Sequence, residues 1–186
     1  MIAAVQTKPS FADRLNFDLL RFKFEIGLVN DQKDAMEMAE LAVSTKLAGE
    51  AKVVVDKSYA GGLLGVGPEA PRHQRLKDLV ARTAAAEQAD MGKADAEAAN
   101  DRDGNRLAAL GEQYVSFGNY AVGIPMIEAG LRKDQLRHPD DTKLHLAIAY
   151  YRAGQKAKAL AEFRDVRGTD GAADLAGLWV LHLGSR

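Results

Sequence analysis

Residues 107–130 read LAALGEQYVSFGNYAVGIPMIEAG, and residues 146–166 read LAIAYYRAGQKAKALAEFRDV. Tyr114 and Tyr150 are 36 residues apart, and so are Gly118 and Gly154. In both stretches, large apolar residues recur at helical spacing before and after the equivalent glycine, which is Gly118 in the first stretch and Gly154 in the second. A fixed period of this length, with two helical patterns per period, is typical of an array of stacked helix pairs.

Two further helical patterns precede these copies. Phe11, Leu15, Leu19, Phe22 and Ile26 follow one another at spacings of four, four, three and four residues, which predicts a first helix ending near residue 30. Residues 35–68 then form a weaker copy of the repeat. We align its Gly49 with Gly118 and Gly154, and we expect a third helix pair there.

Residues 69–103 predict a long, alanine-rich helical insert. Its second half carries one large apolar residue, Met91, so alanine gives it helix propensity but little area to bury. The first half carries Arg72, Arg75, Lys77 and Arg82 against Asp78, and the second half carries Glu87, Asp90, Asp95 and Glu97 against Lys93. The insert is either a solvated helix face or a protruding helix that contacts a partner.

The composition excludes several classes of function. Hydrophobic residues make up 47% of the 186 residues and charged residues 27%, with a net charge of −1. This net charge gives the protein no overall positive potential that would attract nucleic acid, so no nucleic-acid partner is expected. The absence of cysteine excludes disulfides, Cys-ligated zinc and thiol catalysis.

The chain contains no run of eighteen apolar residues, so we expect no membrane span. Residues 1–9 do not have the pattern of a secretory signal. They are typical of a cut into a longer chain, and we expect a fragment of a larger, bacterial-type repeat protein. The expected compartment is a soluble one, cytoplasmic or periplasmic.

The sequence offers little for catalysis. His138 and His145 are close in sequence, but Pro139 and a helix start separate them, so they do not form a metal-binding pair at i and i+4. No Gly-x-Ser-x-Gly motif is present, and the carboxylates are scattered over polar faces. We interpret each histidine as structural, and we expect no enzyme, no catalytic residue, no metal site and no cofactor.

The two copies resemble the tetratricopeptide repeat (TPR). The first copy matches that pattern at Leu107, Leu110, Gly111, Tyr114, Gly118, Tyr120, Gly123, Ile127 and Gly130. The second copy matches it at Leu146, Ala147, Tyr150, Gly154, Ala159, Phe163 and Val166. The departures are Lys156, in place of the second tyrosine, and Pro139, late in a longer loop between the repeats.

The resemblance implies an all-α fold, a right-handed α-α superhelix of antiparallel helix pairs with about nine helices. Residues 1–186 would form a single domain. It would contain a weak repeat at 35–68, the insert at 69–103, two repeats at 104–139 and 140–173, and a C-terminal capping helix at 174–186.

The resemblance also implies a function. First helices of such repeats line a concave groove, and the candidate groove residues are Asn105, Glu112, Leu144, Ile148, Tyr151 and Arg152. We therefore expect an interaction scaffold that binds a protein or peptide partner. The alternative is an architectural segment of a larger solenoid that self-associates through exposed terminal helices. Tyrosine and arginine are enriched in binding hot spots; equally, Tyr151 could cover a neighbouring helix and Arg152 could be a solvated cation at a helix end.

Small residues in the first copy predict close helix contacts. We expect Gly111 and Gly123 to lie where the paired helices touch, with leucine at Gly111 overpacking the contact. Alanine at Gly123 is expected to be tolerated or stabilising through helix propensity. Pro125, in the second helix of the pair, predicts a late helix start or a kink.

Overall fold

The structure, a computed structural model, describes residues 2–100, 103–133 and 136–184. All of its regular elements in these ranges are helical, which confirms the all-α class, with ten α-helices in place of about nine. The first are α1 (Ile2–Gln6), the 3-10 helix η1 (Asp13–Leu15), α2 (Asn16–Glu25), α3 (Gln32–Ser44), α4 (Ala48–Ala60) and α5 (Ala70–Asn100). They are followed by α6 (Gly104–Ser116), α7 (Tyr120–Arg132), α8 (Pro139–Arg152), α9 (Lys156–Asp165) and α10 (Ala172–Gly184).

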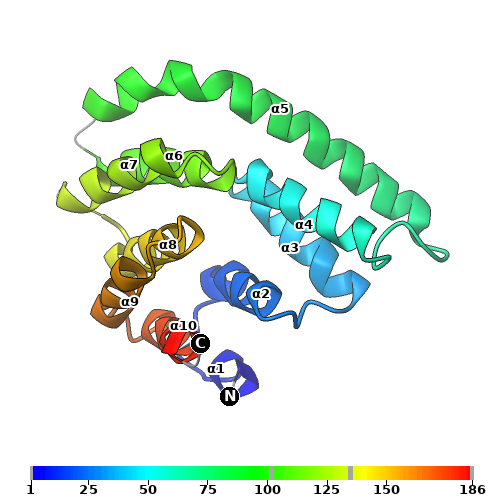
Figure 1. Cartoon of the computed structure of the whole chain (residues 1–186), viewed down its shortest axis with the longest axis horizontal. Helices are drawn as coiled ribbons and strands as arrows, with labels where there is room; N and C mark the ends of the chain where they lie inside the picture. The colour runs from blue at the N-terminus through cyan, green and yellow to red at the C-terminus, as the bar shows by residue number, and fades with distance from the viewer. Residues whose placement is uncertain (1, 101–102, 134–135, 185–186) are drawn as a thin grey trace.

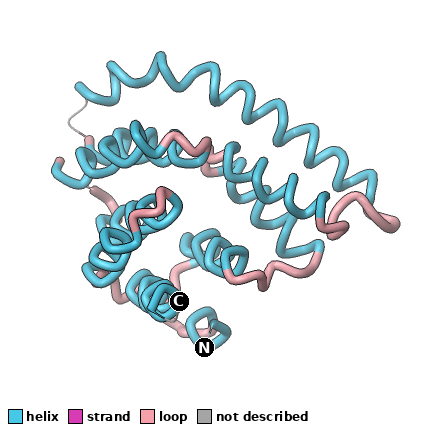
Figure 2. Tube along the Cα trace, viewed as in Figure 1, coloured by secondary structure: helices cyan, strands magenta, loops and turns pink. Residues whose placement is uncertain are grey.

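Consecutive helices form antiparallel pairs that stand around α2. The pairs α3–α4, α6–α7 and α8–α9 follow one another along an arc, α10 continues it, and α2 lies on the inner side (Figure 1). The long helix α5 runs along the outer side and contacts α3, α4 and α6. Short loops join the members of each pair (Figure 2). None of the described helices is long and apolar enough to cross a bilayer.

The turn inside each pair has the same backbone geometry. Gly118 and Gly154 have φ values of 80° and 75°, and Lys46 occupies the same place between α3 and α4 with φ 61°. The counterpart of the two glycines is therefore Lys46, and the alignment through Gly49 was wrong. Gly49 instead lies at a helix contact, where an added Cβ would be 2.6 Å from the backbone oxygen of Ser116.

Lys46 gives a first test of this register. A residue with a side chain costs about 1–2 kcal/mol in the left-handed region, and glycine removes that cost. Part of the gain is offset because glycine also makes the unfolded chain more flexible. We expect Lys46→Gly to raise the free energy of unfolding by about 0.5–1 kcal/mol in urea titrations. Lys52→Gly, in the interior of α4, should lower it by a similar amount. A loss of stability for Lys46→Gly would contradict the shared turn.

The helices α6 and α7 meet through glycines. A Cβ on Gly111 would lie 2.7 Å from the carbonyl oxygen of Gly123, and a Cβ on Gly123 would lie 2.4 Å from that of Gly111. The contact expected for both residues is confirmed. The expectation that alanine is harmless at Gly123 is contradicted, because the obstructing atoms belong to the backbone and cannot rotate away. Pro125 lies inside α7, which begins at Tyr120, so the helix does not start late.

We expect Gly123→Ala to destabilise the protein by about 1–3 kcal/mol through overpacking. Gly177→Ala is the matched control, since nothing lies within 4 Å of a Cβ at that helical glycine. Helix propensity should make the control neutral or stabilising by up to about 1 kcal/mol. If Gly123→Ala and Gly177→Ala changed the denaturant midpoint by the same amount, the close approach of α6 and α7 would be contradicted.

Helix α2 is buried on nearly all sides. The helix expected from the stripe that starts at Phe11 is shorter than predicted: the 3-10 helix η1 precedes it, and α2 ends at Glu25, so the predicted end near residue 30 was wrong. Phe17 and Leu20 belong to an apolar cluster with α3 and α4, whereas Leu19 and Phe22 belong to a second cluster with α8, α9 and α10. Residues 17–22 are all buried, including the charged Asp18 and Arg21, so this part of α2 has no solvated face. Helix α2 therefore joins the two halves of the arc.

Candidate functional site

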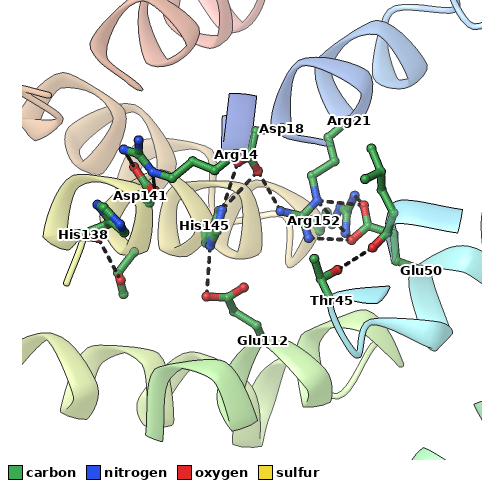
Figure 3. Close-up of polar contacts among 12 residues, drawn as sticks. Arg14, Asp18, Arg21, Thr45, Glu50, Glu112, His138, Asp141, His145 and Arg152 are labelled. Carbon is green, nitrogen blue, oxygen red and sulfur yellow. Dashed lines mark hydrogen bonds and ion pairs between the residues drawn. The ribbon is translucent and has the colours of Figure 1, made fainter. Parts of the chain in front are cut away.

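Two charged residues of α2 point into the inner face of the arc. Asp18 and Arg21 are 3% and 6% exposed, and Arg21 Nη1 donates to Asp18 Oδ1 at 2.7 Å. Figure 3 shows how they meet side chains from the surrounding helices. Buried charges are stable only when paired and hydrogen-bonded. The partners of Asp18 and Arg21 therefore define a polar cluster inside the arc.

Glu50 of α4 is the centre of one half of this cluster. Arg21 Nε lies 3.1 Å from both of its carboxylate oxygens and Arg21 Nη2 lies 2.8 Å from Oε2. Arg152 Nη2, at the end of α8, donates to Glu50 Oε1 at 2.5 Å. Burial alone would raise the pKa of Glu50, but the charges of Arg152 and Arg21 outweigh it and hold that pKa well below its ordinary value. Glu50 is therefore ionised and shared by two guanidinium groups.

His145 of α8 is the centre of the other half. Its Nε2 lies 3.0 Å from Asp18 Oδ1, and its Nδ1 lies 2.9 Å from Glu112 Oε1 of α6. A neutral imidazole can donate from one nitrogen only, so two carboxylate partners select the doubly protonated ring. Burial opposes this charge, but Asp18 and Glu112 outweigh it and raise the pKa of His145 well above its ordinary value.

This ring makes the stability depend on pH. The pKa of His145 is raised in the folded state, so its ion pairs contribute fully below the unfolded value of about 6.5 and are lost as the pH rises through the raised pKa. Urea titrations from about pH 6 to about pH 9 should show a falling free energy of unfolding, and His145→Gln should remove most of that slope. His138→Gln, an exposed control, should keep it. Equal slopes for His145→Gln and the wild type would contradict the geometry.

The structure separates the six candidate groove residues into two groups. Leu144 and Ile148 are 0% and 2% exposed and belong to the same apolar cluster as Leu19 and Phe22 of α2. Helix α2 thus lies where a bound partner was expected. These two side chains would contact a partner only if α2 moved away.

The other four make polar contacts. Glu112 binds His145, Arg152 binds Glu50, and the Tyr151 hydroxyl donates to Glu25 of α2. Asn105 accepts a hydrogen bond from the backbone N–H of Arg137, in the segment before α8. Glu112, Tyr151 and Arg152 are therefore brought together around α2, and Asn105 serves a loop contact instead.

A cavity of 220 Å³ lies beside this cluster. Met38, Val54 and Val115 give it apolar walls, and its polar walls come from Arg152, Tyr120, Ser116, Lys57 and the carboxylates Glu25 and Glu50. Arg152 commits only Nη2 to Glu50 among the described residues, and its side chain is 26% exposed. Val53, 46% exposed, lines the same cavity from α4. Helix α2 thus does not fill the inner face at this cavity.

Sequence reasoning missed Asp18, Arg21, Glu50 and the role of His145. One signal was present, because Asp18 and Arg21 interrupt the otherwise apolar run at residues 17–22. Such a segment has no solvated face for its charges. The partners could not be identified in the same way, since Asp18 and His145 are 127 residues apart.

Over the described residues, no group of three or more His, Asp and Glu side chains is placed to hold a metal ion. Comparison with family models, with curated proteins and with solved structures finds no match. The fold and the cluster define the class as an all-helical protein of antiparallel helix pairs with an internal helix.

Proposed function

We propose that the protein is an interaction scaffold that binds a protein or peptide partner at the inner face of the arc. In this proposal the helix pairs belong to a TPR-like, right-handed solenoid, in which the inner face is the binding face. The internal helix α2 covers the centre of that face. The cavity beside Arg152 is an opening at the edge of α2.

The cavity carries the proposal. Its volume of 220 Å³ is below the roughly 300–1,000 Å³ of pockets that take a whole small-molecule ligand. It suits a single inserted side chain. Its apolar walls would contact the body of that side chain, and the uncommitted donors of Arg152 would bind a polar group at its end. A partner surface that presents one anchoring side chain is the kind of ligand that these dimensions favour.

The test uses peptides selected from a displayed random library against the full chain. Val53→Glu places a charge at the mouth of the cavity without touching the buried cluster, and it should weaken the selected peptides by about tenfold or more, a change of about 1.4 kcal/mol. Val122→Glu is the matched control, because Val122 is 38% exposed on α7 and does not line the cavity. Equal affinities for the two variants would remove the cavity from the interface.

The architectural alternative has an observation of its own. Leu181 on α10 is 56% exposed, and an open groove beside it is lined by Val5 of α1, Phe163 of α9 and Leu178 of α10. In a solenoid, the next helix would cover such a face. Sedimentation of the full chain with Leu181→Lys decides this point. An unchanged mass would exclude self-association through this end.

A further inference from the structure

Helix α10, which lies at the end of the arc, leaves an apolar face uncovered (Figure 1). Asp174 and His182 are its only titratable side chains, so it has the composition of a helix that is covered on all sides. Its buried side packs against α1, α2, α8 and α9. On the opposite side Leu181 is 56% exposed, Gly177 is exposed and Val180 is half-buried. These positions are three and four residues apart, which is the spacing of a helix contact.

An open groove of 580 Å³ lies beside this face. Its apolar lining comes from three helices and includes Val5 of α1, Phe163 of α9 and Leu178 of α10. The groove is more than twice the volume of the 220 Å³ cavity beside α2, so it has room for several side chains. Gly177 also lines it, and a Cβ there would meet nothing within 4 Å. The backbone of a partner can therefore approach α10 closely at this glycine.

The charges that line the groove leave two guanidinium groups without a carboxylate. Asp174 is the carboxylate of the lining, and Lys8 Nζ binds its Oδ1 at 2.7 Å. Arg164 and Arg167 line the groove and are exposed, and neither side chain has a hydrogen bond or ion pair with a described residue. Asp165 attracts Arg167 at a distance, but a lysine of α8 already binds it. The groove thus combines an apolar floor with a cationic rim.

We propose that this groove binds an amphipathic helix of a partner protein, with apolar side chains against Leu181 and carboxylates against Arg164 and Arg167. An apolar stripe at i, i+3, i+4 and i+7 is the usual way in which a helix fills such a groove. Carboxylates beside the stripe can make bidentate hydrogen bonds to the two guanidinium groups. A second copy that docked through the same face would bring the same two arginines and an aspartate that is already bound. The charges therefore favour an acidic partner helix.

The probe is a displayed library of helical peptides with leucines fixed at i, i+3, i+4 and i+7 and random residues on both sides of that stripe. The full chain serves as the target. Peptides selected from the library should carry Asp and Glu more often than Lys and Arg along one side of the stripe. A selection without this excess of carboxylates would overturn the proposal, and so would a selection that recovers no binding peptide.

Charge reversal locates the carboxylates. Arg164→Glu with Arg167→Glu should weaken the selected peptides by about tenfold or more. Peptides in which lysine replaces the selected carboxylates should bind this variant better than they bind the wild type, which also shows that the variant is folded. Arg75→Glu with Arg82→Glu is the matched control, because it makes the same change in charge on exposed residues of α5 that do not line the groove. Equal affinities for the two double variants would overturn the proposal.

A steric variant tests whether the peptide lies on α10. Gly177→Gln should fold, because a Cβ at this position meets nothing, but its side chain would cover the floor of the groove and weaken the peptides by about tenfold or more. Val53→Glu, at the cavity beside α2, should leave their affinity unchanged, which separates this inference from the proposed function. The opposite result for either variant would place the peptides on another surface and overturn the proposal. A dimer of the full chain that Leu181→Lys dissociates would also overturn it, because a second copy would then occupy the groove.

Discussion

Glu50→Ala is expected to lower the free energy of unfolding by about 3–5 kcal/mol. Glu50 is 4% exposed and is the shared carboxylate of Arg21 and Arg152. Its removal leaves the buried guanidinium of Arg21 with Asp18 alone. The loss then includes the desolvation of a charge that has lost its main partner, which is why breaking a buried pair costs more than the pair contributes.

Asp56→Ala is the matched control for this variant. Asp56 lies six residues further along the same helix and pairs with Lys52, where both side chains are about half exposed. An exposed pair of this kind contributes only about 0–1 kcal/mol. Urea titrations at neutral pH would give both values. A Glu50→Ala loss no larger than the Asp56→Ala loss would show that Glu50 is hydrated and that the cluster is not buried.

Trp179→Ala is the second large change, with an expected loss of about 3–5 kcal/mol. Trp179 is 2% exposed, and its ring stacks on Phe163 with centroids 5.4 Å apart. Phe22 of α2 meets the same ring edge-on at 5.2 Å, and Tyr151 of α8 lies at 5.3 Å. Removing the indole would leave a void where α2, α8, α9 and α10 meet. The lost contacts therefore affect α2 as well as the C-terminal helix.

Trp179→Phe separates packing from hydrogen bonding. The indole Nε1 has no acceptor among the described residues, so phenylalanine removes a buried unpaired donor while keeping an aromatic ring in place. We expect it to lose less than half of the free energy that alanine loses. Thermal unfolding of both variants measures the difference. Equal losses would show that the ring contacts with Phe22 and Phe163 contribute little.

Local patterns predicted the helix pairs well. The apolar residues around Gly118 and Gly154 predicted α6–α7 and α8–α9, because a helix period and a turn glycine are both local signals. The first pair was placed three residues out of register. Its turn residue is Lys46, and a lysine in the left-handed region has no recognisable sequence signature. The small residues at Gly111 and Gly123 predicted a close contact, but their spacing could not show that the obstructing atoms belong to the backbone.

The inner face could not be predicted in this way. The stripe through Leu19 and Phe22 predicted a helix, but its location depends on contacts with residues far along the chain, such as Glu50 and His145. Leu144 and Ile148 were therefore expected on an open groove, where the structure has α2. The buried charges Asp18 and Arg21 were the available indication that this helix is surrounded by protein.

The position of α2 inside the arc is tested most directly by hydrogen exchange of the full chain. Backbone amides in the second half of α2, such as Phe22 and Lys23, should exchange only through global unfolding, at the same free energy as Ile148 and Ala149 in α8. That result would confirm α2 as an integral helix of the core. Exchange of the α2 amides at a much lower free energy, with α8 still protected, would show that α2 leaves the inner face and would contradict the account.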